Sequence, residues 1–71
     1  MNGLFIRSAE DKQKLEMIYL ASNERLSQRV IRVLSVKKDD ILAYCYSRNQ
    51  LRTFKKENVM SVYPYKREVG T

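Results

Sequence analysis

Histidine is absent from this 71-residue chain, and Cys45 is its only cysteine. Without histidine, a serine or cysteine nucleophile lacks its usual general base, so the composition argues against an enzyme with catalytic residues. Structural zinc sites need several Cys and His ligands, so the supply of ligands excludes one. Neither Gly3 nor Gly70 belongs to a phosphate-cradling loop, and we therefore expect no bound cofactor.

Long apolar runs and paired cysteines are also missing. No run approaches the roughly 20 residues of a membrane-spanning helix, so we expect no membrane partner. A lone cysteine allows no intrachain disulfide, and together with the lack of a signal-peptide pattern it predicts a reducing, cytoplasmic setting. One proline and two glycines leave little room for linkers. We therefore expect one domain over residues 1–65 and a loosely held tail over residues 66–71.

The net charge of +6 is unevenly distributed along the chain. Residues 1–24 carry three cations and four anions, a net −1, whereas residues 25–71 carry eleven cations and four anions, a net +7. A surface of one sign attracts phosphate-bearing or other anionic partners. The alternative is that these cations only keep a small domain soluble.

A short helix is predicted over residues 3–13, because Leu4, Phe5 and Ala9 have the spacing of one helical face. Alternatively, Ser8 caps a shorter helix, since Ser8 followed by Asp11 resembles a capping box.

Five strands are predicted after the helix, over residues 15–20, 26–36, 41–47, 50–55 and 59–63. The second does not keep a strict period of two, which predicts a bend or bulge near its middle. Asn23 suits the left-handed backbone of a hairpin turn, and Pro64 ends the last strand. The pattern predicts a mainly β (α+β) fold: a strongly bent five-stranded β-barrel of the SH3 or Sm-like kind.

The stretch over residues 41–55, ILAYCYSRNQLRTFK, combines two strands, a turn, aromatics and arginines. A two-residue turn at Arg48 and Asn49, with Asn49 left-handed, would place Cys45 opposite Arg52 and separate the tyrosines from that arginine. A three-residue loop would instead place Tyr46 opposite Arg52. The aromatic and cationic side chains would then share one face, able to stack bases and neutralise phosphates.

Arginine captures phosphate or carboxylate in a planar, bidentate manner, and Arg48 and Arg52 flank this turn. The same positive surface could extend over the cations Arg29, Arg32, Lys55 and Lys56. For the lysines, a solvated face with local ion pairs is the favoured interpretation. Tyr44 and Phe54 are interpreted as core aromatics, and Cys45 as a small buried hydrophobe.

The run AYCYSRNQLRTFKKENV, residues 43–59, resembles the signature of the WYL domain family, with weaker similarity over residues 15–62. The positions that match in type and spacing are Tyr44, Cys45, Arg48, Arg52, Thr53 and Phe54. The Trp-Tyr-Leu triad of the family falls on Asp-Asp-Ile at residues 39–41, and Tyr46 stands where histidine is usual. Asn49 and Lys55 replace the family's glycine and arginine, and no helix-turn-helix accompanies the motif.

The resemblance implies an Sm-like barrel that senses ligands in bacterial transcription regulation, with nucleic acids or nucleotides as ligands. It points to Tyr46, Ser47, Arg48 and Arg52 as pocket residues. The predicted ligand-binding set is therefore Arg48, Arg52, Tyr46, Ser47, Arg29 and Lys55. The leading hypothesis is a non-catalytic module that binds single-stranded nucleic acid or a nucleotide. The alternative is a protein-interaction module that forms homo-oligomers or binds a regulatory protein.

Overall fold

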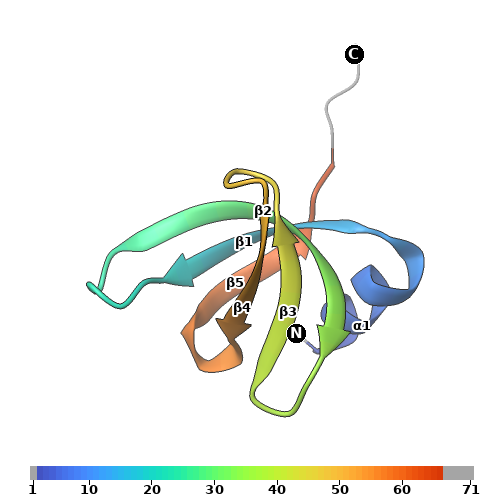
Figure 1. The fold of residues 1–71 in the computed structure, drawn as a ribbon, viewed down its shortest axis with the longest axis horizontal. Helices are drawn as coiled ribbons and strands as arrows, with labels where there is room; N and C mark the ends of the chain where they lie inside the picture. The colour runs from blue at the N-terminus through green and yellow to red at the C-terminus, as the bar shows by residue number, and fades with distance from the viewer. Residues whose placement is uncertain (1, 67–71) are drawn as a thin grey trace.

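One helix precedes five strands in the computed structural model, which describes residues 2–66 (Figure 1). The elements are α1 (Asn2–Asp11), β1 (Lys14–Leu20), β2 (Leu26–Val36), β3 (Asp40–Cys45), β4 (Gln50–Lys55), the 3₁₀ turn η1 (Lys56–Asn58) and β5 (Val59–Pro64). This order confirms the predicted mainly β fold with one N-terminal helix. Most of the predicted tail, residues 67–71, lies outside the described residues.

Helix α1 packs mainly against β2 and buries Phe5 and Ser8. The capping alternative for Ser8 is wrong, because Ser8 lies inside the helix and is fully buried. Its Oγ donates a hydrogen bond to the Gln13 carbonyl and accepts one from the Val33 N–H at 2.9 Å. The helix ends at Asp11, and Lys12 follows with a φ of 59°, a left-handed conformation. Ser8 thus ties the helix to both the loop after it and β2.

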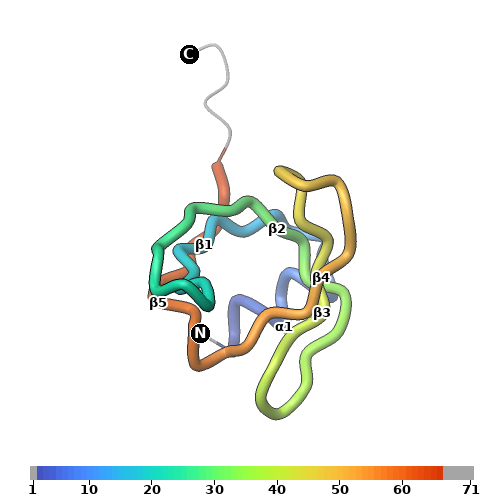
Figure 2. Tube along the Cα trace, turned by 60° about the vertical axis from the view of Figure 1, so that its left-hand side comes forward, coloured from blue at the N-terminus to red at the C-terminus, as the bar shows by residue number. Residues whose placement is uncertain are grey.

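The five strands form one antiparallel sheet in the order β4-β3-β2-β1-β5. The sheet curls strongly, and the β4–β5 connection crosses the gap between its two edge strands (Figure 2). The predicted closed barrel is not confirmed, because β4 and β5 are opposite edges of the sheet. Instead, the Tyr19 hydroxyl of β1 accepts a hydrogen bond from the Lys55 N–H at the end of β4, at 3.0 Å.

Two irregularities accompany the bend of the sheet. The β2–β3 register shifts between Val33 and Ser35, so the predicted bulge in the second strand is present but lies nearer the end of the strand than its middle. The β1–β5 register also shifts, between Ile18 and Tyr19. Bulges increase local twist, so both shifts help an otherwise short sheet to curl around its core.

Alternate residues of the strands point to the concave face and form the core with Phe5 of α1. The buried strand residues are Leu15, Met17, Ile31, Val33, Ile41, Ala43, Cys45, Phe54 and Val59. Phe54 and Cys45 are thus core residues, as predicted. Tyr44 is not: it pairs with Leu51 on the convex face and is half-buried.

The β3–β4 hairpin follows neither predicted register. Its loop spans residues 46–49, so that Cys45 pairs with Gln50 and Ala43 with Arg52. The third strand therefore ends at Cys45 and not at Ser47. Beyond that end, Tyr46 still continues the β2–β3 pairing, since its N–H donates to the Val30 carbonyl of β2 at 3.0 Å.

Two turns carry left-handed residues. Asn49 has a φ of 54°, as predicted for the β3–β4 turn. In the β1–β2 turn the left-handed residue is Glu24, with a φ of 63°, and not Asn23. Asn23 instead accepts a hydrogen bond from the Arg25 N–H through its side-chain oxygen at 3.1 Å, the pattern of an Asx-turn.

Candidate ligand-binding surface

The concave face has an open cleft of about 290 Å³ at the end of β1 that is remote from α1. We define this cationic cleft by its lining residues, Tyr19, Leu20, Ala21, Ser22, Arg29, Arg52, Thr53, Lys55 and Asn58. Its charged residues are two arginines and one lysine, and no carboxylate lines it. The cleft is therefore a local concentration of positive charge on a chain that is already basic.

Arg29 and Arg52 reach the cleft because both belong to the inward-facing set of the strands. Arg29 pairs with the buried Met17 and Arg52 with the buried Ala43, and cross-strand partners point to the same face. The two guanidinium carbons each lie 5.8 Å from the centroid of the Phe54 ring. Two cations thus share one aromatic ring as their common support.

Hydrogen bonds orient Arg29 further. Its Nε donates to the Ser27 hydroxyl at 3.1 Å, and Ser27 Oγ donates in turn to the Tyr19 carbonyl at 3.4 Å. Its Nη1 lies 3.7 Å from Cys45 Sγ. None of these partners is a carboxylate, so they hold the guanidinium in place without neutralising its charge.

The Cys45 thiol is the buried neighbour of this cluster. Burial alone would raise its pKa, but hydrogen bonds from the Ser47 hydroxyl, from Arg29 and from the backbone N–H groups of Arg48 and Ser47 outweigh burial and lower the pKa below its ordinary value. The Sγ to Ser47 Oγ distance is 3.2 Å. The side chain has no exposed surface, so we assign it a structural role beneath Arg29.

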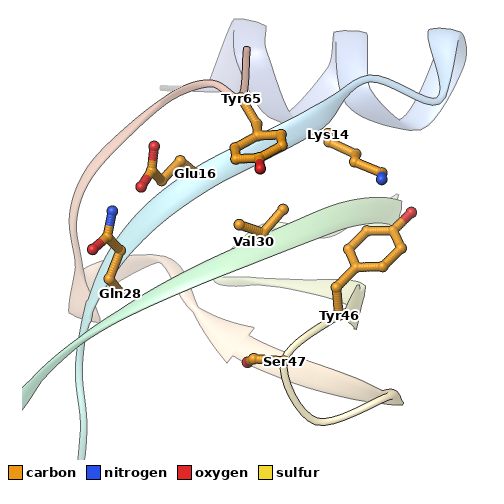
Figure 3. Close-up of a pocket in the computed structure, with 7 residues that line it drawn as sticks. All are labelled: Lys14, Glu16, Gln28, Val30, Tyr46, Ser47 and Tyr65. Atoms are coloured by element: carbon orange, nitrogen blue, oxygen red, sulfur yellow. The ribbon is translucent and has the colours of Figure 1, made fainter. Parts of the chain in front are cut away.

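A second pocket, of about 450 Å³, opens on the convex face (Figure 3). We define this convex pocket by Lys14, Glu16, Gln28, Val30, Tyr46, Ser47 and Tyr65. Val30 lies at its centre, with Glu16 and Gln28 on one side, Lys14 and Tyr46 on the other, and the Tyr65 ring above. The two pockets lie on opposite faces of β2, because Arg29 alternates with Gln28 and Val30 along that strand.

The predicted binding residues therefore divide between two surfaces. Arg29, Arg52 and Lys55 line the cationic cleft, whereas Tyr46 and Ser47 line the convex pocket. Arg48 is exposed at the tip of the β3–β4 hairpin and lines neither pocket. The single aromatic and cationic platform of the three-residue loop does not form, because Arg52 pairs with the inward-facing Ala43, whereas Tyr46 lies in the loop and lines the convex pocket.

Several residues that line the two pockets were not predicted as binding residues from the sequence, among them Tyr19, Lys14, Glu16, Gln28 and Tyr65. The alternation of Lys14 and Glu16 along the first strand was a usable signal, since it places both on one face. Tyr65 had no local signal. It is positioned by its N–H, which donates to the Lys14 carbonyl at 2.9 Å and extends the β1–β5 pairing.

Within residues 2–66, no group of three or more His, Cys, Asp or Glu side chains is arranged to hold a metal ion. The same residues contain no helix that is long and apolar enough to cross a membrane.

No protein-family model matches the sequence, and no curated protein is significantly similar to it. Among solved structures, the chain is similar to the proteasome accessory factor B/C (PafBC) of Arthrobacter aurescens, with a TM-score of 0.78 and 22% sequence identity. The alignment covers 97% of this chain but 12% of that protein, so the chain spans only a small part of its length. The similarity shows that this chain shares its fold with a segment of PafBC.

Proposed function

We propose that this chain is a non-catalytic module that binds a phosphate-bearing ligand, a single-stranded nucleic acid or a nucleotide, in the cationic cleft. The observation that carries the proposal is the convergence of Arg29, Arg52 and Lys55 on one cleft whose lining has no carboxylate. Like charges repel, so such a group is stabilised when an anion binds among them. Guanidinium groups also match the geometry of phosphate oxygens.

The surroundings of the arginines support the same ligand class. Both guanidinium groups lie near the Phe54 ring, and Tyr19 contributes a second ring that meets Phe54 edge to face at 5.0 Å. Phe54 is buried, so Tyr19 is the aromatic residue that lines the cleft. The cleft thus combines positive charge with an accessible aromatic ring, as sites for single-stranded nucleic acid commonly do. Arg29 is already oriented by Ser27, so little side-chain entropy is lost when it binds.

The WYL-like signature of residues 43–59 points the same way. The family resemblance implies a ligand-sensing barrel in bacterial transcription regulation, and Arg52 is one of the positions that match. We therefore place the module in the cytoplasm, where its ligand would bias a regulatory partner protein.

The test is a titration of a fluorescein-labelled single-stranded oligonucleotide by anisotropy at several salt concentrations. Counterion release predicts that log affinity falls linearly with log salt, with a slope of about −0.7 per phosphate contacted on a single strand. Three cations in the cleft then give a slope of roughly −2. We expect Arg52→Gln and Arg29→Gln each to weaken binding by roughly tenfold or more and to reduce the slope by about 0.7.

The matched control is Arg7→Gln, which removes the same charge from an exposed position on α1 that lines neither pocket. It should change affinity little, since an exposed charge outside the cleft is screened by salt. Equal losses for Arg7→Gln and Arg52→Gln would show that only net charge matters and would contradict the cleft. If the oligonucleotide does not bind at low salt, the proposed function is refuted.

A second candidate function is homo-oligomerisation through the open edges of the sheet. β4 and β5 end the strand order, and each carries an exposed apolar residue, Leu51 at 55% and Met60 at 46% exposure. Exposed strand edges pair with other chains unless they are blocked. Light scattering after size exclusion would detect a dimer that persists in Arg52→Gln and dissociates in Leu51→Lys; a monomer at high concentration excludes this function.

A further inference from the structure

We infer that the convex pocket is a second binding site, which takes a planar heteroaromatic ring carrying an anionic group, the chemistry of a nucleoside monophosphate. This site is separate from the cationic cleft, because the two pockets lie on opposite faces of β2. The inference rests on the arrangement of the pocket's own residues and does not depend on the function proposed for the cleft.

The first observation is that the aromatic walls are held in place without a ligand. Tyr46 is fixed by its N–H bond to the Val30 carbonyl, and the Tyr44 ring meets its ring edge to face at 5.1 Å. The backbone of Tyr65 is anchored by its N–H bond to the Lys14 carbonyl. Between the two rings lies Val30, which is half-buried and provides an apolar floor. Two aromatic rings that project from anchored backbone around an apolar floor favour a flat ligand over a flexible one.

The second observation is that the polar groups of the pocket are sorted by kind (Figure 3). The Glu16 carboxylate and the Gln28 amide lie on one side and together offer hydrogen-bond acceptors and donors. The Lys14 ammonium lies on the other side, and Arg32, its cross-strand partner, adds a second cation to that end of the sheet. A ring with a hydrogen-bonding edge at one end and a negative group at the other fits this polarity.

The third observation is the position of Lys14, which favours an anionic ligand over a cationic one. Two tyrosines and a carboxylate could also form a cage for an ammonium group. However, the Lys14 Nζ already lies 4.6 Å from the centroid of the Tyr46 ring and occupies that cation-binding face. A second cation would meet its charge at close range, whereas a phosphate would be attracted to it. The chain's net charge of +6 adds to the preference for an anionic ligand.

The experiment is a chemical-shift titration of ¹⁵N-labelled protein with cytidine 5′-monophosphate and adenosine 5′-monophosphate, with inorganic phosphate as a parallel arm. Each nucleotide should shift the amide signals of Glu16, Gln28 and Val30, which phosphate alone should leave unmoved. Tyr65→Ala should weaken the nucleotide affinity measured at these signals by about fivefold or more, the loss of one stacking partner. Glu16→Gln should change the ratio of the two nucleotide affinities, because it alters the edge that reads the base.

The control is Tyr63→Ala, which removes an exposed tyrosine of β5 that does not line the pocket. Nucleotide affinity should be unchanged. Millimolar nucleotide that leaves the convex signals unmoved would overturn the inference, as would equal losses for Tyr63→Ala and Tyr65→Ala. Choline binding in place of nucleotide binding would also overturn it, by assigning the pocket to a cation.

Two further comparisons distinguish a free nucleotide from a nucleic acid strand, and a failure of the proposed function from a failure of this inference. If a dinucleotide or longer strand shifts the convex signals at lower concentration than the mononucleotide, the ring belongs to a nucleic acid strand; the reverse order assigns it to a free nucleotide. Shifts at Arg29 and Arg52 report on the cationic cleft. If the convex-pocket signals shift and the Arg29 and Arg52 signals do not, the proposed function is refuted and this inference stands. If the Arg29 and Arg52 signals shift and the convex-pocket signals do not, this inference is refuted and the proposed function stands.

Discussion

Replacing Ser8 by alanine should destabilise the fold more than any other removal of a single hydroxyl, because Ser8 is the buried polar residue of the described chain. Its hydroxyl accepts from the Val33 N–H and donates to the Gln13 carbonyl. In Ser8→Ala, the Val33 N–H loses its acceptor, and β1 offers no replacement because the β1–β2 pairing ends one position earlier, at Arg32. An unsatisfied buried donor costs about 1–3 kcal/mol.

The other terms are smaller. The Gln13 carbonyl belongs to a half-buried residue, so water can replace the lost donor and the loss is about 0.5–1 kcal/mol. Alanine is the better helix former and returns about 0.5 kcal/mol. The net loss is about 1–3.5 kcal/mol, a large part of the roughly 4–11 kcal/mol expected for a domain of this size.

Urea denaturation followed by circular dichroism measures this loss. Amide hydrogen exchange then locates it, since the Val33 N–H should exchange faster in Ser8→Ala than in the wild type under native conditions. Ser22→Ala is the control, because Ser22 is exposed in the β1–β2 turn and its removal should change stability by less than about 0.5 kcal/mol. A Ser8→Ala protein as stable as this control would refute the role assigned to the hydroxyl.

Three other changes test further contacts. Tyr19→Phe should lower the free energy of unfolding by about 0.5–1.5 kcal/mol and speed exchange of the Lys55 N–H, which loses its acceptor; unchanged exchange would contradict that bond. Lys12→Gly should raise the melting temperature by a few degrees, because glycine adopts the φ of 59° after α1 without the strain of about 1 kcal/mol; a lower melting temperature would refute this. The Cys45 pKa is lowered in the folded state. Its thiolate therefore stabilises the fold increasingly as pH rises from the lowered pKa towards the ordinary 9.0, and this contribution to stability is lost as pH falls. The stability difference between wild type and Cys45→Ala should therefore be larger at pH 9 than at pH 7, and a constant difference would exclude the shift.

The order of elements was predictable because it depends on local patterns. Alternating side chains marked the strands, and the broken period over residues 26–36 marked the bulge that the β2–β3 register confirms. The hairpin register was not predictable from its own residues. The loop takes four residues, 46–49, and the Tyr46 N–H binds the carbonyl of Val30, which lies sixteen positions earlier in the chain. No local pattern indicates that contact. Likewise, barrel closure depends on whether two distant strands meet, and β4 and β5 do not pair.

The candidate site shows the same division between local and distant information. Arg52 was selected for its chemistry and for a motif, and Arg29 for its place in a basic strand, but neither pattern indicated that both would flank the Phe54 ring. That contact requires the curl of the sheet, which brings β2 and β4 together across β3. The interpretation of Tyr44 as core is wrong for a local reason: Tyr44 lies between the buried Ala43 and Cys45, and side chains alternate along a strand, so Tyr44 faces the convex side.

Strand β2 connects the two surfaces, because three consecutive residues of it serve both. Arg29 faces the cationic cleft, whereas Gln28 and Val30 face the convex pocket. Side chains alternate between the faces of a strand, so a change that slips β2 by one position would exchange the two sets and abolish both sites at once. The Ser8 hydroxyl opposes such a slip, since it binds the Val33 N–H of the same strand. The residue that anchors the helix therefore also helps to fix the register on which both candidate binding sites depend.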